Sequence, residues 1–190
     1  MNSLRSVSIS RRLWLILIVS VVMLLALGML MLKQLHDDLY QAKAQKTQHV
    51  VQTASGILNY YHDLETAGTL TRDVAQKQAL TAVRGLRYDQ NDYFWINDLT
   101  PVMIMHPANP KLDGQNLSAI RDPDGFAVFN EMVAVAKAKG AGMVNYRWPK
   151  PGASAPVEKT SYVKLFEPWG WVIGSGVYID DMQAEFYGQV

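Results

Sequence analysis

The sequence predicts an α+β fold in which a transmembrane helix continues into a long N-terminal helix packed on a five-stranded antiparallel sheet. Three observations lead to this prediction. A charge-free apolar run close to the N-terminus is long enough to cross a membrane. Apolar residues then recur at helical spacing, without a proline, to about Ala67. From Tyr88 onward, five short runs rich in aromatic and β-branched residues follow, each bounded by turn residues.

The apolar run is LWLILIVSVVMLLALGMLML, residues 13–32. Twenty helical residues span about 30 Å, which is the thickness of the hydrocarbon core of a bilayer. Arg5, Arg11 and Arg12 precede the run, and the positive-inside rule then places the N-terminus in the cytoplasm. The predicted divisions are a cytoplasmic N-terminus (1–12), a transmembrane helix (13–32) and a periplasmic domain (33–190).

A cleaved signal peptide is the alternative interpretation of this run. Ala26 and Gly28 offer small residues at a possible cleavage site. The apolar stretch is longer than the 7–15 residues of a usual signal-peptide core, and it continues past that site. An uncleaved membrane span is therefore the favoured prediction.

Three helices are expected in the extracytoplasmic part. The first runs from Lys33 to about Ala67 as a direct continuation of the membrane helix, and Gly68 ends it. Thr71 is a suitable cap for the second, which covers residues 72–86 with Val74, Leu80 and Val83 on one side. The third covers residues 126–139, between the second and third strands.

Five strands are expected, and their order along the chain predicts the layers. Two strands form a hairpin, a helix crosses over, and three strands then form a meander. The crossover helix would cover one face of the sheet and the long N-terminal helix the other, which leaves room for a pocket between sheet and crossover. The predicted strands are Asp92–Asn97, Val102–His106, Met143–Trp148, Thr160–Phe166 and Trp171–Ile179.

Alternation along the strands gathers aromatic side chains on one face of the sheet. A pocket with apolar walls and a few hydroxyl donors would have the usual composition of a small-ligand site. An aromatic core whose hydroxyls reach solvent is the alternative. The candidate lining residues are Tyr93 and Trp95 on the first strand, Tyr146 and Trp148 on the third, and Tyr162 on the fourth.

Three charged or titratable residues are further candidates for a ligand site. Lys164 shares a face with Tyr162 by alternation, and if it is buried it needs an anion, either a ligand carboxylate or a structural Asp or Glu. His106 ends the second strand and either bonds the backbone or contacts a ligand. Arg87 precedes the first strand and either reaches the pocket or stabilises its own loop.

Composition and motifs argue against several other classes of protein. Lys and Arg total 18 and Asp and Glu total 17, so no basic excess points to nucleic acid. Cysteine is absent, which excludes disulfides and thiolate metal sites. The chain has no G-x-S-x-G, no HExxH and no glycine-rich phosphate loop, and its four histidines are scattered. We therefore expect no enzyme activity, no cofactor and no metal.

Five segments together resemble the single Cache domain (sCache type 2) of bacterial methyl-accepting chemotaxis proteins. They are DYFWIND, MIMHP, LDGQNLSAIRDPDG, GMVNYRWPKPG and KTSYVKLFEPWGWVIGSGVYIDD, and the similarity extends over about residues 35–181. The resemblance implies a PAS-like sheet behind a long N-terminal helix, located between two spans of the bacterial inner membrane. It also implies a small-molecule ligand and a histidine of MIMHP that faces it. The unbroken helical pattern from Leu13 to about Ala67 is a rigid element that two subunits could share, and we therefore expect a homodimer in the full receptor.

The resulting expectation is a chemoreceptor sensor region that binds a small monocarboxylate through Lys164, His106, Tyr146 and Tyr162. Similar domains bind two- and three-carbon acids, which makes acetate, propionate, pyruvate and lactate the candidates. The chain has no cluster of several arginines, which argues against phosphate and against di- and tricarboxylates. Two alternatives stay open: the sensor region of a histidine kinase or diguanylate cyclase, and a membrane-anchored structural domain without a ligand.

Overall fold

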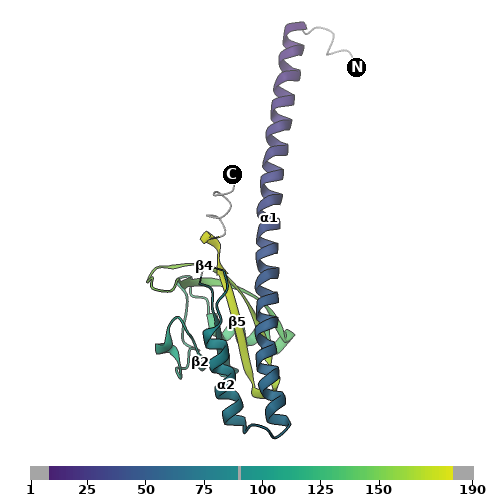
Figure 1. The fold of residues 1–190 in the computed structure, drawn as a ribbon. Coiled ribbons are helices and arrows are strands. Elements are labelled where there is room, and N and C mark those ends of the chain that lie inside the picture. Colours follow the sequence, from purple (N-terminus) through teal and green to yellow (C-terminus); the bar gives the residue numbers. More distant parts are fainter. Residues whose placement is uncertain (1–8, 90, 182–190) are drawn as a thin grey trace. The chain divides into compact units, whose positions relative to one another are not determined.

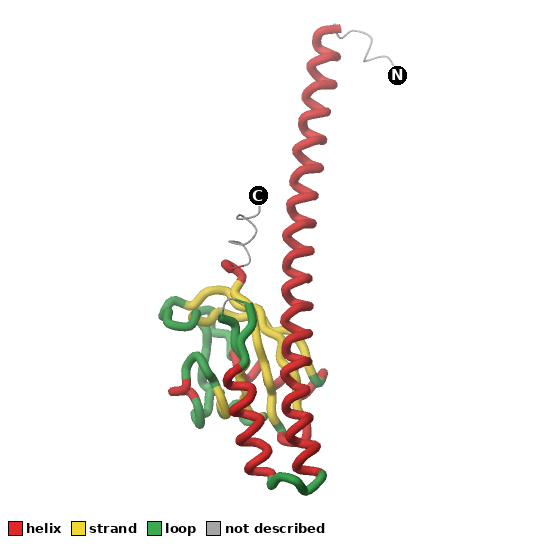
Figure 2. The backbone as a smooth tube through the Cα atoms, viewed as in Figure 1, coloured by secondary structure: helices red, strands yellow, loops and turns green. Residues whose placement is uncertain are grey.

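The computed structural model describes residues 9–89 and 91–181, and the chain divides into two units at Gln41. The elements are drawn in Figure 1 and coloured by type in Figure 2. They are α1 (Ile9–Thr66), α2 (Arg72–Gly85), β1 (Phe94–Asp98), β2 (Met103–Met105), α3 (Val128–Lys139), β3 (Ala141–Pro149), β4 (Pro156–Phe166) and β5 (Trp171–Tyr178), with short 3-10 helices at Pro110–Leu112 and Glu167–Trp169.

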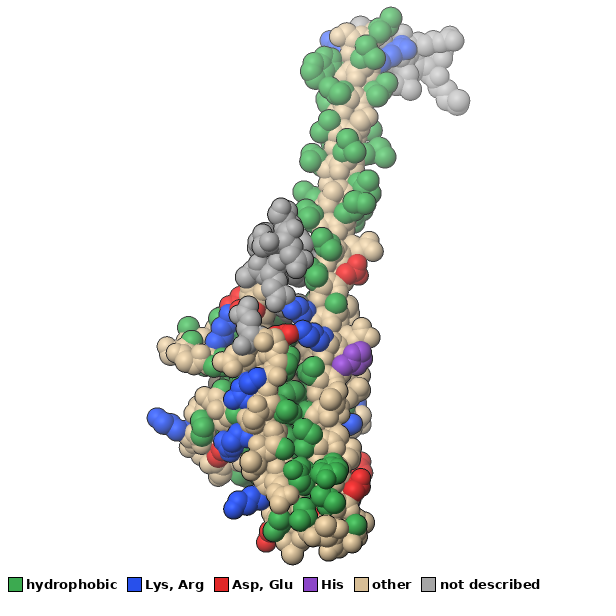
Figure 3. Space-filling model, in the orientation of Figure 1, with side chains coloured by type: hydrophobic (Ala, Val, Ile, Leu, Met, Phe, Trp, Pro, Cys, Tyr) green, Lys and Arg blue, Asp and Glu red, His purple; other side chains and the backbone are tan. Residues whose placement is uncertain are grey.

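Helix α1 contains the apolar run predicted to cross a membrane. By length and composition it can span a bilayer, and none of its most apolar stretch is buried within the protein. Figure 3 shows apolar side chains along the visible face of this segment. Such exposure is costly in water and is the normal state of a helix that lies in lipid.

The second unit, residues 42–190, contains a five-stranded sheet in the order β2-β1-β5-β4-β3. Every neighbouring pair is antiparallel, as predicted. The turn between β1 and β2 is held by Asp98, whose Oδ1 accepts the backbone N–H groups of Thr100 and Val102 at 2.7 and 2.8 Å. A carboxylate that replaces backbone acceptors in this way fixes a tight hairpin.

Helices cover both faces of the sheet. Residues 42–66 of α1, together with α2, bury one cluster with Phe94, Ile96 and Ile173 of the sheet. The buried side chains of α1 recur at helical spacing and are Thr47, Val51, Ala54, Ser55 and Leu58. Helix α3 buries the second cluster on the opposite face, with Trp95, Val144 and Val163 of the sheet. The predicted sandwich is confirmed.

Two details of the prediction are wrong. Helix α2 buries Ala75, Ala79 and Val83, whereas Val74 is 41% exposed, because small residues let α2 pack closely. The long hairpin of β3 and β4 also extends further than predicted, since pairing continues to Pro149 opposite Pro156. The predicted fourth strand started at Thr160 and therefore left out Lys159.

Candidate functional site

A cavity of about 260 Å³ lies beside the sheet face that also packs against α3. That volume is below the range of drug-sized ligand pockets and suits a molecule of a few heavy atoms. The end of β2 contributes one wall and the loop between β3 and β4 the other. The lining residues are Tyr93, His106, Ala108, Asn109, Trp148, Pro149, Lys150, Pro151, Gly152 and Ala153.

Lys159 of β4 lies buried beside this cavity, with 2% of its surface exposed. In the sheet it is paired with Tyr146 on one side and Tyr178 on the other, so alternation directs it to the face of both tyrosines. Its ammonium donates to the hydroxyls of Tyr93 and Tyr178 at 3.2 and 3.3 Å. It also lies 4.5 Å from the ring centre of each of these tyrosines, which adds cation–π attraction.

The charge of Lys159 is not neutralised by an ion pair with any described residue. Asp92 is close enough for its charge to interact with Lys159, but burial dominates and raises the pKa of Asp92 to about 6. A buried ammonium that has only hydroxyl and ring partners is unfavourable by several kcal/mol. The site therefore provides a strong attraction for an anion that enters the cavity.

Hydrogen-bond donors surround the ammonium. The Tyr146 hydroxyl lies 2.9 Å from Ser161 Oγ, and the Tyr178 hydroxyl donates to the Pro149 carbonyl at 2.8 Å. Burial raises the pKa of both tyrosines, so each keeps its proton. Within the described part of the chain, the buried indole N–H of Trp95 has no acceptor, and the centre of the Trp95 ring lies 5.6 Å from the Lys159 ammonium.

His106 contributes a neutral donor. Its side chain is buried beside the Tyr93 ring, with 5.0 Å between ring centres. Burial, followed by the charge of Lys159, lowers the pKa of His106 to about 4. The backbone N–H of Asn109 donates to Nδ1 at 2.9 Å, so the single proton of the neutral ring belongs on Nε2. Near pH 7 this imidazole is an uncharged N–H donor.

We expect the His106 ring to titrate near pH 4 instead of 6.5. Since its folded pKa is depressed, its contribution to stability is present above the unfolded pKa and is lost as pH falls from 6.5 toward 4. Proton NMR of the histidine ring resonances measures the midpoint, and loss of one resonance in His106→Asn assigns it. A midpoint near 6.5 would show that the ring is solvated and not held as described.

The structure brings together most of the residues predicted to form the site. Tyr93, His106 and Trp148 line the cavity. Trp95 and Tyr146 pack in the same cluster as Tyr93, on the α3 side of the sheet.

Lys164 and Tyr162 lie elsewhere. Tyr162 is paired with Ser175 and packs in the cluster beneath α1 and α2. Lys164, two residues further along β4, points to that same side and is only partly buried. The expectation that Lys164 is a buried lysine on the pocket face is therefore wrong. The prediction that Tyr162 and Lys164 share one face of β4 is correct. The pocket, however, lies on the opposite face of the sheet.

Arg87 is exposed, and its guanidinium donates to the carbonyls of Arg84 and Leu86 at 2.9 and 2.6 Å. This is the loop-stabilising arrangement that was one of its two expected roles.

Lys159 and Tyr178 were missed from the sequence, as were the residues of two loops that line the cavity, Ala108, Asn109 and 149–153. Extending the fourth strand by one residue would have placed Lys159 with Ser161 and Val163, on the side that packs against α3. Tyr178 lay inside the predicted fifth strand. Its position opposite Lys159 depends on the register between β4 and β5, which local sequence patterns do not give.

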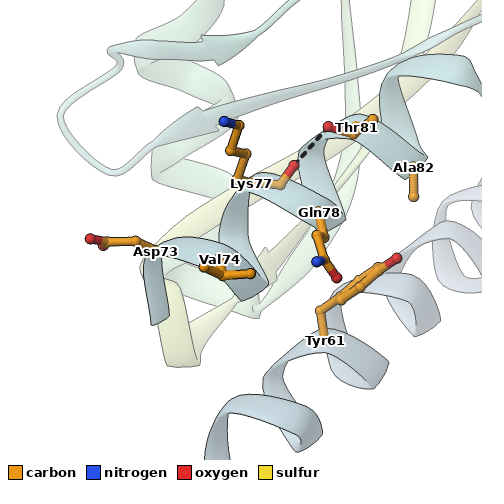
Figure 4. Close-up of a pocket in the computed structure, with 7 residues that line it drawn as sticks. All are labelled: Tyr61, Asp73, Val74, Lys77, Gln78, Thr81 and Ala82. Atoms are coloured by element: carbon orange, nitrogen blue, oxygen red, sulfur yellow. Dashed lines mark hydrogen bonds between the residues drawn. The ribbon is translucent and has the colours of Figure 1, made fainter. Parts of the chain in front are cut away.

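A second hollow lies between α1 and α2, and Figure 4 shows its lining. Tyr61 of α1 faces residues of α2 there, and Thr81 donates to the Lys77 carbonyl at 2.8 Å. The hollow is an open groove of about 660 Å³. Its polar side chains, including Asp73 and Lys77, are exposed or partly exposed, and it has no buried charge comparable to Lys159. The cavity beside Lys159 is the better candidate for a ligand site.

The family model of the Cache domain matches residues 29–187. The chain belongs to the Cache domain family. A solved structure described as "Structural basis for carboxylic acid recognition by a Cache chemosensory domain" is 74% identical, with a TM-score of 0.73 over 76% of this chain and 98% of its own. A "Periplasmic sensor domain of chemotaxis protein" is 46% identical, with a TM-score of 0.73 over 74% of this chain and 97% of its own. The resemblance seen in the sequence is thereby confirmed.

Longer relatives contain this Cache domain as one part. The methyl-accepting chemotaxis protein McpP of Pseudomonas putida is 74% identical over all of this chain, which covers 35% of McpP. The sensor histidine kinase MctS of Rhizobium johnstonii is 39% identical over 60% of this chain and 24% of its own. The chain thus spans about a third or less of these relatives.

Proposed function

We propose that this Cache domain is the sensor region of a bacterial chemoreceptor and that it binds a small monocarboxylate through Lys159. The observation that carries the proposal is the buried ammonium of Lys159, which has no ion-pair partner among the described residues and lies beside a cavity. A ligand carboxylate would neutralise that charge with a strong, charge-assisted hydrogen bond.

The charge and size of the site favour a short acid with a single carboxylate. Lys159 is the buried cation of the site, His106 is neutral near pH 7, and Lys150 of the cavity lining is already paired with Asp180 and Asp181, so a second carboxylate would lack a free counter-charge. The cavity of about 260 Å³ is suited to acids such as acetate, propionate, pyruvate and lactate. The 74% identical domain described by its carboxylic acid recognition supports the same class of ligand.

Each neighbour of Lys159 has a proposed role. The hydroxyls of Tyr93, Tyr146 and Tyr178, the Nε2–H of His106 and the unpartnered N–H of Trp95 are donors for the ligand oxygens. Trp148 forms part of the apolar wall. Lys164, Tyr162 and Arg87 have no part in the proposal, because two of them lie on the other face and the third bonds its own loop.

A thermal-shift panel tests this function. Among acetate, propionate, pyruvate, lactate, succinate and citrate, we expect one or more monocarboxylates to raise the melting temperature and the last two to have little effect. A ligand at 100 times its Kd stabilises the folded state by about 2.7 kcal/mol. Stabilisation by succinate or citrate alone, or by none of the six, would contradict the proposal.

The sensor region of a histidine kinase is the second candidate. MctS favours it, since a sensor histidine kinase shares 39% identity over 60% of this chain. McpP favours the chemoreceptor, because its match covers the whole chain at 74% identity. Acid-dependent swimming in cells that carry the intact protein would support the chemoreceptor, and acid-dependent autophosphorylation would support the kinase.

We further propose that residues 13–32 span the inner membrane, that residues 33–190 are periplasmic, and that two copies pair along α1. The arginines before the apolar run and the length of α1 support this arrangement. Single cysteines between Leu35 and Leu58 give a clean test, since the chain has none of its own. Labelling by an impermeant thiol reagent tests the side of the membrane, and cross-linking at helical intervals tests the pairing. Protection of all these cysteines from the reagent would argue against the periplasmic location. Cross-links without helical periodicity would argue against pairing along α1.

A further inference from the structure

The Tyr178 hydroxyl connects the ligand site to the loop between β3 and β4. On one side it accepts a hydrogen bond from Lys159 at 3.3 Å, and on the other it donates its proton to the Pro149 carbonyl at 2.8 Å. Tyr178 is buried, and Pro149 is the last residue of β3, where the cavity loop of residues 149–153 begins. A single hydroxyl thus bonds the site lysine and the loop backbone at the same time.

The loop has a second attachment to the region around Tyr178. Lys150 forms ion pairs with Asp180 and Asp181, at 2.8 and 2.7 Å. These carboxylates come two and three residues after Tyr178, just beyond the end of β5. The Lys150 ammonium also lies 5.6 Å from the centre of the Tyr178 ring. Residues 149–150 and residues 178–181 are therefore joined by a partly buried hydrogen bond and by an exposed pair of ionic contacts.

We propose that Tyr178 and Lys150 form a relay that transmits occupancy of the Lys159 site to the segment that follows β5. The relay rests on the proposed function. A tyrosine hydroxyl has one proton, and a carboxylate beside Lys159 is a stronger acceptor than the Pro149 carbonyl. When the acid binds, the hydroxyl turns its proton to the ligand and the Pro149 carbonyl loses this bond. The start of the cavity loop then shifts, and Lys150 carries the shift to Asp180 and Asp181.

The two attachments have different strengths, which suits a relay. Exposed ion pairs contribute little to stability, so Lys150 can follow the loop without holding the fold together. The hydrogen bond from Tyr178 to the Pro149 carbonyl is the contact that depends on the ligand. Asp180 and Asp181 do not line the cavity, whereas Lys150 lines it and contacts both of them.

Backbone NMR of the full chain in lipid nanodiscs, at saturating propionate, tests the relay. In the wild type we expect propionate to shift the amide signals of Lys150, Asp180 and Asp181. The amide of Lys150 belongs to the same peptide group as the Pro149 carbonyl and reports directly on its hydrogen bond. In Tyr178→Phe and in Lys150→Gln, the shifts at Asp180 and Asp181 should be lost, even where higher propionate is needed to saturate the site.

Tyr88→Phe is the matched control. Tyr88 also bonds β5 through a partly buried hydroxyl, which lies 2.8 Å from Ser175 Oγ, but Tyr88 packs against the cluster on the opposite face. Its removal should leave the shifts at Asp180 and Asp181 in place. If propionate shifts Asp180 and Asp181 in saturated Tyr178→Phe as it does in the wild type, the relay is overturned. If Tyr178→Phe does not fold, the same comparison with Lys150→Gln decides. If calorimetry detects propionate binding without shifts at Asp180 and Asp181, only the relay fails. If none of the monocarboxylates binds, the proposed function and the relay fail together.

Discussion

Replacing Lys159 with methionine is expected to weaken binding of the preferred monocarboxylate by about 2–5 kcal/mol, which is about 30-fold or more. The ammonium is the buried cation beside the cavity, and the tyrosine and imidazole donors around it are neutral. Without it, the ligand carboxylate would be transferred from water into a site whose other lysine, Lys150, is already paired with Asp180 and Asp181. Isothermal titration calorimetry with the acid selected by the thermal-shift panel measures the loss.

Lys164→Met is the control for this experiment. It makes the same chemical change on the same strand, but at a partly exposed position on the other face of the sheet. We expect its affinity to stay within about twofold of the wild type, since exposed charges at a distance are screened by solvent. Lys159→Met itself should fold at least as stably as the wild type, because methionine has a similar volume and removes a buried charge. A wild-type affinity in Lys159→Met, or a large loss in Lys164→Met, would reverse the assignment of the two lysines.

Leu58→Ala is expected to lower the free energy of unfolding by about 2–5 kcal/mol. Leu58 has no exposed surface and packs from α1 into the cluster that covers one face of the sheet. Truncation leaves a cavity that the close-packed neighbours Val51, Ala54 and Ile173 fill only in part. Urea unfolding of residues 33–190, followed by circular dichroism, measures the effect.

Leu35→Ala tests whether that loss comes from burial. Leu35 belongs to the same helix but is 44% exposed and precedes the unit of residues 42–190. Its truncation should change the free energy of unfolding by less than about 0.5 kcal/mol, as for most exposed positions. Equal effects of the two substitutions would mean that α1 does not pack on the sheet through Leu58.

Local patterns predicted the elements of this fold well. Apolar residues recur about every two positions in a strand and about every 3.6 positions in a helix. These spacings predicted the strand around Trp95 and the helix around Met132. The sandwich of layers followed from the order of these elements along the chain. Periodicity is weaker where small residues pack. The buried side of α2 was expected at Val74, Leu80 and Val83, and it lies at Ala75, Ala79 and Val83.

The site was predicted less well, for a physical reason. Alternation states which residues of β4 share a face, but not which face meets α3 and which meets α1. Tyr162 and Lys164 looked like pocket residues beside aromatic neighbours, whereas the register of β4 on β5 places them beneath α1 and α2. A lysine at the start of a strand also looks like an ordinary exposed residue. Lys159 is buried, and its ammonium contacts the hydroxyls and rings of Tyr93 and Tyr178, which are distant from it in sequence.

The central claim is that a small monocarboxylate binds at Lys159, and a crystal structure of residues 33–190 grown with propionate tests it most directly. The account predicts that a carboxylate oxygen of the ligand lies within about 3 Å of Lys159 Nζ. The alkyl tail should then contact Trp148 within the cavity. Propionate bound beside Lys164 or in the groove between α1 and α2, with the Lys159 cavity empty, would contradict it.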